Sequence, residues 1–351
     1  MKNTELIDKL NIEKSLKKAE WVRLIGTYSY DDFEYAKALA QKISVIKFGK
    51  TVCFRGIIEF TNYCKNDCYY CGIRRSNKNL SRYRLSLGEV LQCCSDGYEA
   101  GFRTFVLQGG EDEYFNDDRV VEIIKTIKQG FSDCAVTLSI GEKEKESYKR
   151  FFEAGADRYL LRHETACHEH YKKLHPKNLS LERRLNCLND LKEIGYQTGC
   201  GFMVGSPFQT DENLADDMIY ISEFKPQMAG IGPFIPHKDT PFCDMPSGSA
   251  EKTLFILSLI RIMLPNVLLP ATTALGTVRG DGRQQGVLCG CNVIMPNLSP
   301  MSVRKKYMLY DNKAGTADDS LTGVEKLRSQ MKEIGYTVTV GRGDFKEGNN
   351  D

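Results

Sequence analysis

The stretch "GIIEFTNYCKNDCYYCG", residues 56–72, decides the fold, because an apolar run of strand length passes directly into a loop with three cysteines. Similar apolar runs follow along the chain and alternate with longer segments of helical period. The runs lie at 56–60, 104–109, 135–140, 157–162, 199–204, 229–234, 268–273 and 291–296. Eight buried strands that alternate with helices predict the α/β class and a complete (β/α)8 barrel of the TIM type. An open doubly wound sheet is the alternative.

The segments between these runs carry the start and stop signals of helices. Ser86 and Glu89 have the spacing of a capping box, and Gly195 closes a helical pattern that begins at Leu181. The predicted organisation is an N-terminal helical extension at 1–50, the barrel at 51–310, and a C-terminal helical and strand segment at 311–351 that closes the barrel.

Composition narrows the classes of function. The 351 residues include 48 basic and 46 acidic side chains, a net charge of +2, so no strong field indicates binding to nucleic acid. The longest apolar stretch is interrupted by Arg261, so we expect no membrane span. The N-terminus is charged and lacks an apolar signal segment, which predicts a cytoplasmic protein. Its thirteen cysteines are then expected as free thiols.

Three of the cysteines, Cys64, Cys68 and Cys71, have the spacing C-x3-C-x2-C. Their loop follows the first predicted strand, which places it at the carboxyl-end face where barrel active sites lie. A structural zinc site needs four ligands, and neither Cys93 nor His163 has the spacing of a second ligand pair. Polar residues lie between the three cysteines, and such residues are not typical of a segment of buried core cysteines. The remaining interpretation is an iron–sulfur cluster, in which three thiolates leave one iron open.

With Tyr70 before the last cysteine, this motif is similar to that of the radical S-adenosylmethionine (SAM) enzymes. The resemblance implies a full or partial barrel, a 4Fe–4S cluster on the three cysteines, and SAM as a second cofactor. It further implies that the amine and carboxylate of SAM chelate the open iron. One electron then splits SAM into methionine and a 5′-deoxyadenosyl radical. Since the last cysteine is Cys291, we expect one cluster and no second cluster motif in the C-terminal segment.

The ends of later strands supply candidates for SAM binding. Gly109, Gly110 and Glu111 resemble the family's GGE motif, whose backbone and carboxylate hold the SAM amino group. Ser139 ends the third strand, and we expect it on the cofactor side, with an ordinary strand residue as the alternative. By the same resemblance Arg184 contacts the SAM carboxylate.

Charged and hydroxyl side chains at three further strand ends are candidates for substrate binding. Arg162 and Glu164 share one face of the fourth strand, where buried charge needs a partner. They could pair with each other, or Glu164 could bind SAM while Arg162 holds a substrate anion. Thr272, Thr273 and Met295 follow at the ends of the last two strands.

The five histidines are not predicted as metal ligands. His163 faces away from the Arg162 side of its strand and is expected to pack in the core. We expect His168, His170 and His175 on the surface of a polar helical stretch, and His237 as a hydrogen-bonding residue at the barrel rim.

The resemblance narrows further to the HydE family of FeFe-hydrogenase maturases, in the same group as biotin synthase and methylornithine synthase. It is carried by "GADRYLLRHETA" (155–166), "GIGPFIPHKDTPF" (230–242), "PATTALGT" (270–277) and "NVIMPN" (292–297). It implies radical attack at sulfur in a small anionic substrate, a cysteine-derived iron–carbonyl–cyanide precursor from the maturase HydG. The implied partners are a one-electron reductant such as ferredoxin or flavodoxin and the other hydrogenase maturases, and the product serves the two-iron subcluster of the hydrogenase.

Two other functions stay open at this point. A mutase or lyase similar to methylornithine synthase would share the barrel and the SAM site. A non-catalytic iron–sulfur carrier or scaffold would need the cysteines, but it would not need Glu111, Arg162, Glu164 or Arg184.

Overall fold

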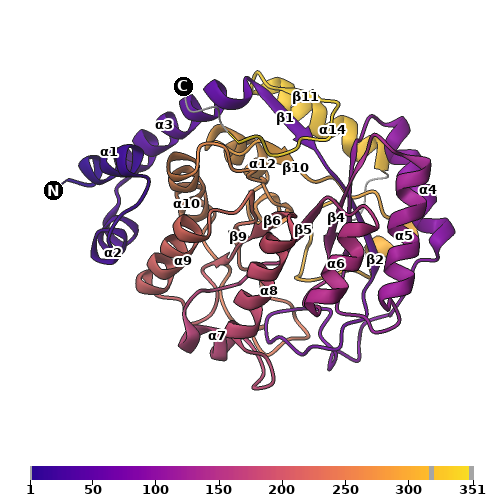
Figure 1. The fold of residues 1–351 in the computed structure, drawn as a ribbon. Helices are drawn as coiled ribbons and strands as arrows, with labels where there is room; N and C mark the ends of the chain where they lie inside the picture. Colours follow the sequence, from indigo (N-terminus) through magenta and orange to yellow (C-terminus); the bar gives the residue numbers. More distant parts are fainter. Residues whose placement is uncertain (1, 316–319, 348–351) are drawn as a thin grey trace.

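A parallel sheet surrounded by helices forms the centre of the computed structural model, which describes residues 2–315 and 320–347 (Figure 1). Six strands follow one another in the order β2-β3-β4-β5-β6-β8, and every neighbouring pair is parallel. Their bounds are β2 Gly56–Thr61, β3 Thr104–Gly109, β4 Ala135–Ser139, β5 Arg158–Leu160, β6 Gln197–Cys200 and β8 Met228–Ala229. The predicted α/β class is therefore confirmed, and all carboxyl ends of this sheet lie at one edge.

The remaining strands form two smaller parallel sets. One contains β10 (Val293–Ile294), β1 (Thr51–Phe54) and β11 (Thr337–Thr339), and the other contains β7 (Met203–Val204) and β9 (Gly232–Pro233). Isolated parallel bridges join Met228 to Leu268, Pro270 to Val293 and Ile57 to Asn297. They connect β8, residues 268–270, β10 and β2.

One predicted strand is wrong, because residues 268–273 make only isolated bridges. Pro270 has no N–H to donate to a ladder. Thr272 is instead the N-cap of helix α11 (Thr273–Val278), with its Oγ accepting a hydrogen bond from the Leu275 N–H at 3.3 Å. The chain thus turns into a helix where the apolar pattern predicts that the strand continues.

Helices pack around the sheet (Figure 1). The N-terminal ones lie on the outside, where α2 packs on α9 and α3 packs on α10. None of the helices in the described ranges is long and apolar enough to cross a membrane. The bounds, with α11 given above, are α1 Asn3–Glu13, α2 Lys18–Thr27, α3 Tyr30–Phe48, α4 Leu87–Glu99, α5 Asp117–Gly130, α6 Lys145–Glu153, α7 His168–Leu174, α8 Leu181–Ile194, α9 Asp211–Phe224, α10 Ala250–Met263, α12 Gly282–Leu288, α13 Met301–Arg304 and α14 Ser320–Glu333.

Local signals set several helix ends. The Ser86 Oγ accepts from the Glu89 N–H at 3.3 Å, and the Glu89 carboxylate accepts from the Ser86 N–H at 2.7 Å, so the predicted capping box is confirmed. Gly195 ends α8 with φ +107°, a left-handed conformation that favours glycine. Because α8 begins at Leu181, as predicted, Arg184 lies in its first turn.

The C-terminal segment covers the amino-end face of the sheet. Thr104, Arg158 and Gln197 begin β3, β5 and β6, and each contacts this segment. The Arg342 carbonyl accepts from the Thr104 Oγ and from the Arg158 Nη2, each at 2.8 Å, and the fully buried Arg158 also pairs with Asp344. Residues 316–319 and 348–351 of the 311–351 segment lie outside the described residues.

The pairing of Asp344 predicts a dependence of stability on pH. Burial raises the pKa of this carboxyl, but the Arg342 hydrogen bond and the Arg158 charge outweigh burial and hold the pKa at about 2, below the ordinary 3.8. A depressed folded-state pKa stabilises the fold above the unfolded value and loses that effect as pH falls through the folded value. We expect Asp344→Asn to lower the urea midpoint at neutral pH, and the difference from wild type to shrink as pH falls below about 5 and to disappear as pH falls below about 2.

The matched control is Asp244→Asn, because Asp244 is exposed and has no ion pair among the described residues. Its midpoint should follow wild type across the same range. A constant Asp344→Asn difference at all pH values would contradict the assigned role of the carboxylate.

Candidate active site

A cavity of about 330 Å³ lies at the carboxyl ends of the strands and contains every residue that the sequence predicts for the cluster, SAM or the substrate. The structure brings these residues together from loops that are distant in the chain. They are Cys64, Cys68, Tyr70, Cys71, Gly109, Gly110, Glu111, Ser139, Arg162, Glu164, Arg184, Thr272, Thr273 and Met295.

The cysteine loop follows β2, and its three thiols are free and half-buried. Burial and then the neighbouring Cys64 raise the pKa of Cys71 to about 12. Burial also raises the pKa of Cys68, and Cys71 and Cys64 add to that shift. Three thiolates this close would repel one another, so they fit a cationic iron cluster that compensates their charge.

Gly109 and Gly110 allow the loop after β3 to lie directly against the cysteine loop. A Cβ on Gly110 would lie 2.2 Å from the Tyr63 carbonyl oxygen and 2.6 Å from the Cys64 Cβ. A Cβ on Gly109 would lie 2.7 Å from the Thr61 Cγ2. A side chain at Gly110 would therefore displace the backbone that carries the cysteines, whereas one at Gly109 would displace the Thr61 side chain of β2.

Glu111 is held in the cavity wall by two neighbours. Its Oε1 accepts from the Glu142 N–H at 2.9 Å, and its Oε2 lies 3.5 Å from the Lys65 Nζ. Gly141 has φ +76°, and a Cβ there would lie 2.2 Å from the Glu111 Cγ. The glycine therefore makes room for the carboxylate at the end of β4.

Arg162 and Glu164 form an ion pair at 3.0 Å, so the pairing that was one of the two alternatives is present. The contact lacks hydrogen-bond geometry, and both Arg162 Nη2 and Glu164 Oε2 are buried without a hydrogen-bond partner. Glu164 has φ +66°, and its N–H donates to the Gly201 carbonyl at 3.0 Å. Both side chains face the cavity and keep hydrogen-bonding capacity for a ligand, which the second alternative requires.

Arg184 joins three parts of the wall. Its Nε donates to the Glu142 Oε1 at 2.5 Å and its Nη1 donates to the Arg162 carbonyl at 2.7 Å. The side chain is 7% exposed and comes from the first turn of α8. The neighbouring Arg183 points to solvent and pairs with Glu144 at 2.6 Å.

The structure adds cavity residues that the sequence did not reveal. Glu59 of β2 pairs with Lys313 and accepts from the Asn297 Nδ2 at 2.8 Å. The Lys313 Nζ also donates to the Tyr307 carbonyl at 3.1 Å. A carboxylate inside an apolar strand signals a buried partner, so Glu59 could have been found. Lys313 lies more than 250 positions away and has no local signal.

Two of the histidine predictions are wrong. His170 and His175 are each 2% exposed rather than on the surface. The His175 Nδ1 lies 3.0 Å from the Tyr171 carbonyl, which can only accept, so the Nε2 accepts from the Tyr70 hydroxyl at 3.2 Å. Burial lowers the pKa of His175 to about 3, so the ring is neutral. His170 lies in α7 and His175 is the C-cap of this helix, and both side chains are buried on its inner side.

Comparisons with known proteins identify the family of this chain. Residues 58–221 match the Radical SAM superfamily. The chain is 46% identical over 307 residues to the FeFe hydrogenase maturase subunit HydE of Thermotoga maritima, a match that covers 86% of this chain and 87% of that protein. It is 28% identical over 303 residues to 3-methylornithine synthase of Methanosarcina barkeri, covering 86% of this chain and 85% of that protein. The crystal structure of methylornithine synthase (PylB) superposes with a TM-score of 0.83 at 26% identity, covering 95% of this chain and 97% of that one.

The parallel α/β fold and the tri-cysteine cavity thus define a radical SAM enzyme, which uses a 4Fe–4S cluster and SAM. Within this class, the chain belongs to the HydE family.

The close approach at Gly110 generates a prediction for cluster assembly. In Gly110→Ala the new methyl group would displace Tyr63 and Cys64, and we expect less iron and sulfide after anaerobic reconstitution. Wild type should bind about four irons per chain if it holds one cubane cluster. About eight irons in wild type would contradict the single cluster.

The matched control is Gly88→Ala, since a Cβ at Gly88 meets no atom within 4 Å. This variant should bind iron like wild type. If Gly110→Ala also reconstitutes fully, the two loops are not packed as described.

Proposed function

We propose that this enzyme acts as a HydE-like maturase in the assembly of the two-iron subcluster of FeFe hydrogenase. The observation that carries the proposal is the single cavity that contains the tri-cysteine loop, the Gly109–Glu111 turn and the Arg162, Thr272, Thr273 and Met295 side chains. The high identity to HydE of Thermotoga maritima across most of both chains supports it. When bound to the cluster, SAM supplies the 5′-deoxyadenosyl radical.

In this proposal Cys64, Cys68 and Cys71 hold the cluster and a separate group of residues holds SAM. Glu111 and Glu164 provide carboxylates for the SAM amino group, and Arg184 provides a guanidinium for the SAM carboxylate. Gly109 and Gly110 offer backbone groups, and Tyr70 and Ser139 line the same side. The Glu111 and Arg184 side chains are already oriented by Lys65 and Glu142, which limits the entropy lost on binding.

The other side of the cavity suits a small sulfur-containing anion. Arg162 would hold a substrate carboxylate, Thr272 and Thr273 would offer hydroxyl groups, and Met295 would pack beside the reacting sulfur. The proposed substrate is the cysteine-derived iron–carbonyl–cyanide precursor from HydG. The proposed partners are ferredoxin or flavodoxin and the other hydrogenase maturases, and the proposed location is the cytoplasm.

We also propose that the parallel sheet closes as a complete (β/α)8 barrel over residues 51–310. The bridges Met228–Leu268, Pro270–Val293 and Ile57–Asn297 support closure, because they connect the last strand of the sheet with the first. Residues 1–50 would form an N-terminal helical extension, and 311–351 a segment that closes the barrel.

A mutase or lyase similar to methylornithine synthase is the second candidate. The superposition with PylB at a TM-score of 0.83 favours it. Both candidates use the same SAM residues and differ in the substrate side of the cavity. A non-catalytic carrier would leave Arg162, Glu164 and Arg184 without a use.

The SAM assignment predicts an effect on binding. Glu164→Gln or Arg184→Ala removes a charged contact of about 1.5–3 kcal/mol, so we expect SAM to bind roughly ten- to a hundredfold more weakly to the reconstituted protein. Calorimetric titration measures the change. Arg183→Ala is the matched control and should bind SAM like wild type, because Arg183 faces solvent. Unchanged affinity in both cavity variants would place SAM elsewhere.

The maturase role predicts activity in a reconstituted maturation. The protein is combined anaerobically with the other two maturases and apo-hydrogenase, and hydrogen evolution is assayed. Wild type should activate the hydrogenase, and Arg162→Gln should lower that activity while it still cleaves SAM, because the arginine is assigned to the substrate. If wild type is inactive where an authentic HydE works, yet cleaves SAM under dithionite, the mutase or lyase candidate replaces the maturase.

A further inference from the structure

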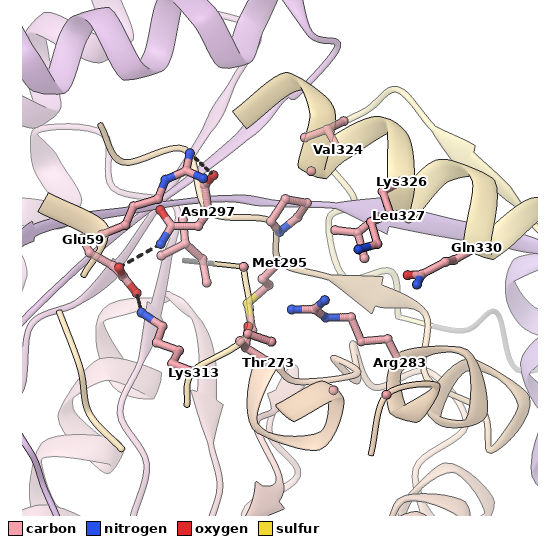
Figure 2. A pocket seen from close by; sticks show the side chains of 18 residues that line it. Glu59, Thr273, Arg283, Met295, Asn297, Lys313, Val324, Lys326, Leu327 and Gln330 are labelled. Carbon is pink, nitrogen blue, oxygen red and sulfur yellow. Dashed lines mark hydrogen bonds and ion pairs between the residues drawn. The ribbon is translucent and has the colours of Figure 1, made fainter. Parts of the chain in front are cut away.

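A second chamber of about 220 Å³ adjoins the reaction cavity. It lies among the residues after β10 and the helices α11, α12 and α14 (Figure 2). Both spaces are lined by Ile57, Glu59, Thr273, Met295 and Lys313, so a single layer of side chains divides them. This volume holds several water molecules or one small organic ion.

Among the described residues that line the chamber, basic side chains outnumber acidic ones. Its only carboxylate among the described lining residues is Glu59, whose charge is offset by Lys313. Arg304 is held by the backbone carbonyls of Ser299 and Asn297, at 2.7 and 2.9 Å.

Arg283 differs from the buried cations of the chamber because its guanidinium has no protein partner among the described residues. It is half-buried, its stem packs against Gly276, and within the described ranges it has no hydrogen bond or ion pair. Figure 2 shows its guanidinium reaching from α12 toward Met295 and Thr273. A guanidinium in a confined space without a protein partner is a ready site for an anion. Lys326, which is exposed on α14, adds a further positive charge at the outer side.

Tyr310 and Arg162 both line the reaction cavity. Burial raises the pKa of the Tyr310 hydroxyl, while the charges of both Arg283 and Arg162 act to lower the pKa. Arg162 lines the reaction cavity, which shares Thr273 and Met295 with the chamber that Arg283 lines.

We propose that the second chamber is a side entrance for a small anionic ligand. Arg283 binds a carboxylate or a similarly small anion there, and the ligand reaches Arg162 by passing between Thr273 and Met295. Met295 suits the dividing layer because its unbranched side chain can change rotamer easily. The route would let substrate enter while SAM and the cluster fill the opposite side of the cavity. Anion binding stands on Arg283 alone, whereas the passage to Arg162 rests on the proposed function.

The binding step is tested with trifluoroacetate, a small carboxylate whose ¹⁹F NMR line broadens when it binds. The protein carries Arg162→Gln and is reconstituted and loaded with SAM. This change removes the anion site of the reaction cavity, so the trifluoroacetate binding that remains is assigned to the second chamber. Adding Arg283→Gln should weaken that binding at least tenfold, because a charge-assisted hydrogen bond is lost. Adding Arg279→Gln is the matched control and should change nothing, since Arg279 is exposed and pairs with Asp281. The site is contradicted if trifluoroacetate binds equally to the two double variants. It is also contradicted if trifluoroacetate does not bind to the Arg162→Gln single variant.

The passage is tested by blocking the chamber. Gly280 lies at its lip, and a Cβ there meets no atom within 4 Å, so Gly280→Trp can add bulk without displacing the backbone. We expect this variant to slow exchange of trifluoroacetate with the Arg162 site of SAM-bound protein at least tenfold. Val278→Trp, an exposed position on α11 outside the lining, should exchange like wild type. Equal rates in both variants would mean that anions use the main opening. A failed SAM-cleavage assay would reject the proposed function and leave the Arg283 result standing.

Discussion

Parallel pairing of the strands is the constraint on which the rest of this molecule depends. Neighbouring strands from β2 to β8 run in the same direction, so the loops that follow them meet at one edge. The cysteine loop, the Gly109–Glu111 turn and the Arg162–Glu164 segment each follow a different strand, and each would be isolated in another topology. The cavity exists because the sheet aligns their carboxyl ends.

Close backbone contact then sets the geometry of the cysteine loop. Gly110 brings the second loop within van der Waals contact of Tyr63 and Cys64, and the Lys65 N–H donates to the Glu111 carbonyl at 2.9 Å. The cysteines are thus supported by the turn proposed to hold SAM. A movement of one loop would displace the other, so the geometry of the cluster and the binding of SAM are coupled.

Charge pairing shapes the remaining wall. The pairs Glu59–Lys313, Arg162–Glu164 and Glu142–Arg184 surround a space of low polarity, where an unpaired charge is costly. The pairs keep the side chains in place without a ligand, and the open donors of Arg162 can still exchange partners. Arg283 has no such partner in the described ranges, and it lines the adjoining chamber.

Short-range patterns in the sequence determined the α/β class, most strand positions and the cysteine motif, because strand runs, capping residues and ligand spacing are local properties. They also placed Arg162, Glu164, Thr272, Thr273 and Met295 at strand ends, although the strand expected at 268–273 is replaced by the start of α11. Tertiary structure alone decided that Lys313 meets Glu59, that His175 is buried against Tyr70, and that Arg283 faces a second chamber. These contacts join residues far apart in the chain, and no local pattern encodes them, since packing of the whole fold sets which distant side chains share a buried space.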